Sequence, residues 1–109
     1  MKIAIFTAAL LLALALPTTQ AADPKANWST HCLKCHGADG KGDTKMGKKL
    51  AVKDYTDTKV QAAMKDEEMF KAIKDGVKQG ETVKMVAYKD KLSDDEIKAL
   101  VEFVRTLKK

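Results

Sequence analysis

Two cysteines separated by only two residues constrain this chain more than any other feature of its sequence. Cys32 and Cys35 are the only cysteines among its 109 residues. A disulfide between them would close too short a loop to join distant parts of a fold. A chain of this size also lies near the lower limit for a hydrophobic core acting alone. We therefore expect a metal or a large buried cofactor to contribute to its stability.

His36 follows the second cysteine directly and completes the pattern Cys-x-x-Cys-His, the attachment signature of c-type haem. Each thiol can add across one haem vinyl group, and the two-residue gap places both sulfurs along one edge of the porphyrin. The adjacent histidine then directs its imidazole at the iron. The sequence thus predicts one haem c, attached through Cys32 and Cys35, with His36 as an iron ligand.

Other chemistries could use the same cysteines, and the sequence favours them less. A thioredoxin-like dithiol would follow a strand in a βαβ unit, which the sequence does not predict. A zinc site would need a second ligand pair farther along, yet no cysteine or histidine follows His36. His31 is the only other histidine. Five positions before His36 it falls on a different helix face, so we expect it at the surface.

The first 21 residues are interpreted as a cleaved secretory signal peptide. A basic start at Lys2 precedes an uncharged apolar run, Ile3–Leu16, and the small residues Thr19 and Ala21 form a cleavage site. The apolar run is shorter than the roughly 18 residues of a membrane span, although an uncleaved anchor is the alternative. Removing residues 1–21 from 109 leaves one domain, 22–109. We expect it in the periplasm, without stable membrane insertion.

Helices are predicted for most of the remaining chain. Proline favours a first helical turn and glycine commonly ends a helix. On these signals we expect helices over 24–35 (ended by Gly37), over 58–64 (capped by Asp57) and from 66 to the stop at Gly76, with a glycine-rich loop at 37–43. No segment alternates apolar and polar residues for long, so strands are minor or absent and the fold class is all-α.

The last helix carries the strongest signals. Ser93 and Glu96 form a capping box, and Leu92 and Ile97 form a hydrophobic staple. Apolar residues then recur along one helix face at Ile97, Leu100, Val101, Val104 and Leu107.

These features together resemble a class I cytochrome c, most closely the small soluble bacterial monohaem type. The run Cys32–Gly37, the glycine-rich loop, the segment Lys84–Tyr88 and the capped last helix carry the resemblance. It covers the whole chain after the leader. It implies short helices wrapped around one haem, with the first and last helices crossing so that Trp28 packs near Leu100, Val101 and Val104.

The resemblance also matches Met85 to the family's methionine ligand on the second face of the iron. Met64 and Met69 are expected to be core residues, and Met46 lies too close in sequence to His36 to reach the far face. Two prolines common in the family are absent here: Val86 follows Met85, and Lys48 follows Gly47. A backbone carbonyl near Gly47 is still expected to accept the His36 ring N–H.

With both axial positions filled, the chain is expected to be a one-electron carrier and not an enzyme. If the Met85 bond is weak, the alternative is an open-site haem protein, either a small-ligand sensor or a peroxidase-like enzyme. A haem subunit of a larger oxidoreductase is a third interpretation.

The formal net charge of the chain is +5, and +4 without Lys2. Lysines concentrate between residues 41 and 53, which favours transient redox partners with acidic docking surfaces. These lysines are mixed with aspartates and lack interleaved aromatic residues, so nucleic-acid binding is not expected. We expect a monomer.

Overall fold

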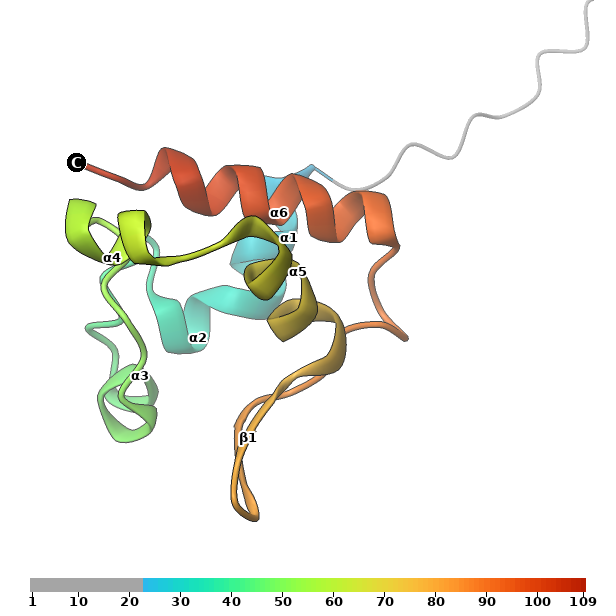
Figure 1. Ribbon diagram of the computed structural model, residues 1–109, viewed down its shortest axis with the longest axis horizontal. Coiled ribbons are helices and arrows are strands. Elements are labelled where there is room, and N and C mark those ends of the chain that lie inside the picture. The colour runs from blue at the N-terminus through green and yellow to red at the C-terminus, as the bar shows by residue number, and fades with distance from the viewer. Residues whose placement is uncertain (1–22) are drawn as a thin grey trace, which may run out of the picture.

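The computed structural model describes residues 23–109, which form a helical shell with one small hairpin (Figure 1). The predicted leader and its cleavage site lie outside the described residues. Within 23–109, no helix is long and apolar enough to cross a membrane. The elements are α1 (Pro24–Asn27), η1 (Trp28–Cys32), α2 (Leu33–His36), α3 (Lys45–Leu50), α4 (Thr58–Ala63), α5 (Asp66–Asp75), β1 (Val77–Gln79), β2 (Thr82–Met85) and α6 (Asp94–Thr106). The all-α prediction is confirmed.

The first helical stretch runs from α1 through η1 to α2 without a break. The Asp23 side chain caps it by accepting a hydrogen bond from the Lys25 N–H at 3.2 Å. Gly37, at φ 78°, ends it as predicted, because a residue with a Cβ is strained at that angle. The sequence did not predict that η1 is a π-helix, a wider turn that often marks functional sites. The π-helical segment ends at Cys32, the first cysteine of the motif.

Helix α6 packs across α1 and α5 and completes the core (Figure 1). The predicted capping box is present: Ser93 Oγ accepts from the Glu96 N–H, and Glu96 Oε1 accepts from the Ser93 N–H, each at 3.1 Å. Ile97 and Leu100 are 0% exposed. Trp28 belongs to the same buried cluster as Leu100, Val101 and Val104, so the predicted crossing of the two terminal helices is confirmed.

Helix α3 and the two-stranded hairpin were not predicted either. Helix α3 begins after Thr44, whose Oγ1 accepts a hydrogen bond from the Gly47 N–H and donates one to the Cys35 carbonyl, each at 2.9 Å. Strands β1 and β2 pair antiparallel, with Val77 opposite Met85. The resulting hairpin protrudes from the helical body beyond the end of α5 (Figure 1).

Helix α4 is joined to α6 by polar side chains rather than by apolar packing alone. The buried Gln61 amide donates to the carbonyls of Tyr55, at 2.7 Å, and Val104, at 2.8 Å. The Arg105 guanidinium donates to the Met64 carbonyl at 2.7 Å. These bonds fix the backbone at Tyr55 and Met64, two residues whose side chains face the same cavity.

Candidate haem-binding site

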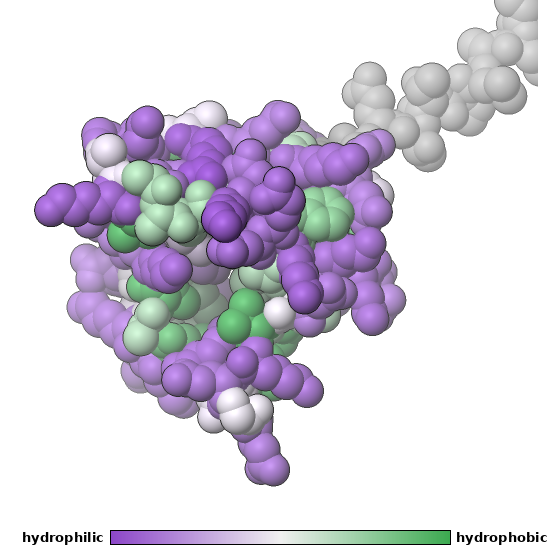
Figure 2. Space-filling view, viewed as in Figure 1, coloured by the Kyte–Doolittle hydropathy of each residue, from purple (hydrophilic) through white to green (hydrophobic). Residues whose placement is uncertain are grey.

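A cavity of about 510 Å³ opens between the first helical stretch, α3, α5 and the hairpin. All four predicted site residues line it: Cys32, Cys35, His36 and Met85. Figure 2 shows apolar side chains gathered around a hollow on an otherwise polar face. Cavities of roughly 300 to 1,000 Å³ with mostly apolar walls are typical of cofactor sites. The cavity is therefore large enough, and apolar enough, for a flat apolar cofactor.

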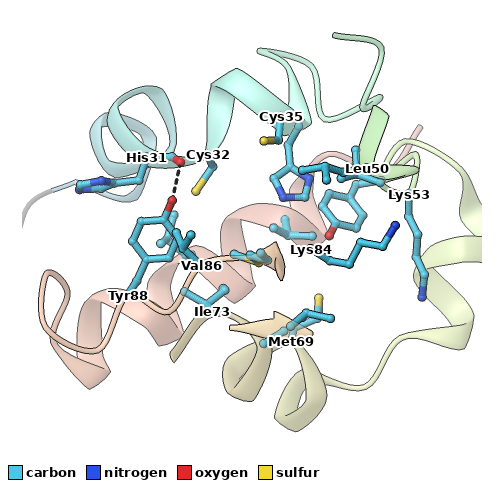
Figure 3. Close-up of a pocket in the computed structure, with 18 of the residues that line it drawn as sticks. His31, Cys32, Cys35, Leu50, Lys53, Met69, Ile73, Lys84, Val86 and Tyr88 are labelled. Atoms are coloured by element: carbon cyan, nitrogen blue, oxygen red, sulfur yellow. Dashed lines mark hydrogen bonds between the residues drawn. The ribbon is translucent and has the colours of Figure 1, made fainter. Parts of the chain in front are cut away.

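The two cysteines lie on one wall of this cavity and are not joined to each other. Cys32 is buried and Cys35 is half-buried, and their side chains project from the same helical stretch (Figure 3). Burial, reinforced by the neighbouring Cys35, raises the pKa of the Cys32 thiol to about 11. Both side chains are thus placed to form thioethers with a group in the cavity.

His36 is buried between two aromatic rings. Its ring centroid lies 5.2 Å from that of Tyr55, nearly stacked, and 5.6 Å from that of Trp28. Burial lowers the pKa of the His36 imidazole, which favours the neutral ring that binds metals. Its Nδ1 atom is buried and has no hydrogen-bond partner among residues 23–109. Unpaired buried polar atoms of this kind are rare and are often found at functional sites.

The prediction that a carbonyl near Gly47 would accept the His36 ring N–H is wrong. The Gly47 carbonyl already accepts from the Val52 N–H at 3.0 Å, and the Cys35 carbonyl accepts from Thr44. The donors to these carbonyls come from the two ends of α3, and His36 Nδ1 bonds to neither carbonyl.

The cavity wall contains every methionine in the described part of the chain: Met46, Met64, Met69 and Met85. Met64 and Met69 pack against the hydrophobic core as expected, but they also face the cavity, which the sequence did not predict. Because all four methionines line the cavity, this position alone does not identify which of them is the second iron ligand. Met85 differs because it ends β2, whose neighbouring residues Lys84 and Val86 lie across the cavity from Cys35 (Figure 3).

His31 does not lie free at the surface, contrary to expectation. It is half-buried and lines the cavity, and its ring meets that of Tyr88 edge-on at 5.4 Å between centroids. Tyr88 also donates from its phenol to the His31 carbonyl at 2.9 Å (Figure 3). The sequence offered one signal for Tyr88, an aromatic residue three positions after Met85 in a segment without helical periodicity.

The zinc alternative finds no support in the geometry. Between residues 23 and 109, no group of three or more His, Cys, Asp or Glu side chains could hold a metal ion. The donors on the cavity wall include two thiols, the buried imidazole of His36 and methionine thioethers, which are donor types that attach and ligate haem.

A helical shell around an apolar cavity, with Cys-x-x-Cys-His on its wall, defines a small c-type cytochrome. The chain belongs to the family described as cytochrome c oxidase, cbb3-type, subunit III, whose profile matches residues 19–104. This match and the structural neighbours confirm the predicted class of small monohaem cytochromes c.

Two solved structures are similar to the chain. The KustC0563 c-type cytochrome is 35% identical with a TM-score of 0.72, and the match covers 81% of this chain and 100% of that one. A tyrosine-to-phenylalanine variant of Kustc0563 is 34% identical with a TM-score of 0.69, covering 80% and 100%. No curated protein sequence matches the chain.

Proposed function

We propose that this protein is a periplasmic one-electron carrier, and not an enzyme, with one haem c attached through Cys32 and Cys35. His36 and Met85 are its axial ligands in this proposal. The observation that carries it is the cavity itself, which has the two thiols and the imidazole on one wall and the Met85 strand across from them. When bound, the haem supplies an iron that changes its charge by one electron.

Two hydrogen bonds within the protein hold the segment Cys32–Gly37, here called the attachment turn, in place. The Trp28 indole N–H donates to the Gly37 carbonyl at 3.0 Å, which anchors the end of α2. The Thr44 hydroxyl donates to the Cys35 carbonyl at 2.9 Å. Both bonds hold the backbone around His36, so the imidazole needs little reorganisation when the oxidation state changes. The apolar wall excludes water from the iron ligands.

Electron exchange would use the rim of the cavity. Val77, Val83 and Val86 are exposed there, at 39%, 45% and 53%, and Lys34 lines the cavity beside the two cysteines. An apolar edge with a lysine beside it, on a chain of net positive charge, suits brief contacts with redox partners that carry acidic surfaces. We propose that the protein, released from its leader after residue 21, meets such partners as a monomer.

Optical spectroscopy tests the proposal. The full chain would be expressed in a haem-maturing periplasm and extracted with acid acetone, and oxidised and reduced spectra would be recorded. We expect the haem to stay with the protein and the oxidised form to show the weak near-infrared methionine–iron band. Release of all haem would overturn the cytochrome assignment.

A pair of methionine variants then tests the second ligand. Met85→Ala should abolish the near-infrared band, while Met69→Leu, the matched control in the same cavity wall, should retain it. Loss of the band in Met69→Leu alone would assign the ligand to α5. Haem retained without the band in the unmodified protein would favour an open-site sensor or peroxidase-like protein.

A further inference from the structure

Two lysines on the cavity wall have no partner for their charge. Lys84, on β2, is half-buried, and Lys53 is exposed; both line the cavity. Neither makes an ion pair or a hydrogen bond through its side chain to another residue of 23–109, where the ion pairs are Lys48–Asp43, Lys74–Asp94 and Arg105–Asp66. In Figure 3 the ammonium ends of Lys53 and Lys84 reach the same side of the cavity, away from the sulfurs of Cys32 and Cys35.

This arrangement places two positive charges at one end of the cavity with no carboxylate paired to them. Lys84 is a half-buried residue in a mostly apolar wall, where an opposite charge is attracted more strongly than it is in bulk water. The acidic side chain of the lining is Glu68, which is exposed on α5 and forms no ion pair with either lysine. The positive charge at this end of the cavity is thus available to a ligand.

The shape of haem supplies such an anion at the required place. Its two vinyl groups and its two propionate carboxylates project from different edges of the porphyrin. If the vinyl edge is bound at Cys32 and Cys35, the propionates extend toward the other end of the cavity. Two carboxylates would then meet two ammonium groups, and charge-assisted hydrogen bonds of this type are stronger than neutral ones.

We propose that Lys84 and Lys53 bind the propionates of the haem, with Lys84 as the more buried anchor. The inference rests on the proposed function, because it requires haem in the cavity. In this proposal strand β2 has two roles: Met85 binds the iron, and Lys84 binds a propionate carboxylate. Lys34 also lines the cavity, but it lies between the two cysteines and so belongs to the opposite, thioether edge.

The test is the pH dependence of the midpoint potential in the haem-loaded protein. A propionate beside an ammonium keeps a low pKa, because the opposite charge favours its ionised form. In Lys84→Gln that pKa should rise by about one unit, a tenfold change in proton affinity. The step in the potential–pH profile should move to higher pH by the same amount. Lys53→Gln should shift it less, because Lys53 is exposed and screened.

Lys78→Gln is the matched control, since it removes the same charge from an exposed position on β1 of the same hairpin, outside the cavity lining. Its profile should match that of the unmodified protein. Equal shifts in Lys78→Gln and Lys84→Gln, or no shift in either, would overturn the propionate assignment.

Covalent haem content, measured on every variant, distinguishes a failure of the lysine assignment from a failure of the proposed function. Full haem content with an unshifted Lys84→Gln profile rejects the lysine assignment and leaves the cytochrome intact. An unmodified protein without covalent haem rejects both.

Discussion

The phenol of Tyr88 donates a 2.9 Å hydrogen bond to the backbone carbonyl of His31, 57 residues earlier in the chain. The Tyr88 N–H donates to the Ile73 carbonyl at 3.0 Å, at the end of α5. One residue thus joins the segment after Met85 both to α5 and to the helical stretch that carries the cysteines. This link closes the cavity on the side of Cys32.

Tyr88→Phe should weaken this closure while leaving the ring in place. Loss of one hydrogen bond should lower the free energy of unfolding by about 0.5 to 1.5 kcal/mol. Denaturant unfolding of the haem-loaded protein measures this, and the near-infrared methionine–iron band should be lost at lower denaturant than in the unmodified protein. Equal midpoints for both proteins would contradict the role assigned to the hydroxyl.

The same bond should depend on alkaline pH. Burial, the largest cause, raises the pKa of the Tyr88 phenol above its usual value near 10. Smaller contributions come from the charges of Cys32 and Cys35, and these vanish once the thiols become thioethers. A raised folded-state pKa gives stability that is complete below the unfolded value and is lost as pH rises through the folded one. The stability difference between Tyr88 and Tyr88→Phe proteins should therefore be constant to about pH 9.5 and shrink above it.

Gly47→Ala should prevent proper formation of the attachment turn. A Cβ at this position would overlap the carbonyl oxygens of Cys35 and Gly42, and backbone atoms cannot move aside as a flexible side chain can. We expect a loss of more than about 3 kcal/mol of stability, or failure to accumulate as haem-loaded protein. Gly80→Ala is the control, because a Cβ there meets nothing within 4 Å. Its positive φ of 61° should cost only about 1 kcal/mol.

Gln61→Leu should separate α4 from α6. The substitution removes the amide donor from the carbonyls of Tyr55 and Val104. The Val104 carbonyl keeps the Leu107 N–H, whereas the Tyr55 carbonyl loses its donor, and a buried unpaired group costs about 1 to 3 kcal/mol. Thermal unfolding should show a clear fall in Tm. Gln79→Leu, an exposed change on β1, should leave Tm nearly unchanged, and a similar fall in both variants would contradict the role of the buried amide.

The sequence predicted those elements whose signals are local. The capping box of Ser93 and Glu96 and the stops at Gly37 and Gly76 depend on residues within a few positions of one another. The cavity also brings together Cys32, Cys35, His36 and Met85, the residues chosen from the motif and the resemblance. Their bonds to haem stay predictions, as does the choice of Met85 over the other methionines of the wall.

The elements that the sequence did not predict depend on contacts with distant residues, or they lack a regular alternation of buried and exposed side chains. Helix α3 is capped by Thr44, whose hydroxyl donates to the carbonyl of Cys35, nine residues earlier. Strand β1 is exposed along its whole length, so its residues show no alternation of apolar and polar character. The π-helical turn before Cys32 has no signature in the sequence that we could identify. The unpaired Nδ1 of His36 depends on how the ring is oriented among Trp28 and Tyr55, which sequence spacing does not reveal.

The hairpin stands apart from the crossed terminal helices, yet its base forms one wall of the cavity. At its tip, Gly80 faces open space, so a residue or a linker inserted there would leave the core packing undisturbed. A single cysteine introduced at this tip could carry a dye or bind the protein to a gold electrode in a defined orientation. The hairpin tip is therefore a site at which the protein can be attached to an electrode, close to the cavity but outside the packed helices that stabilise the fold.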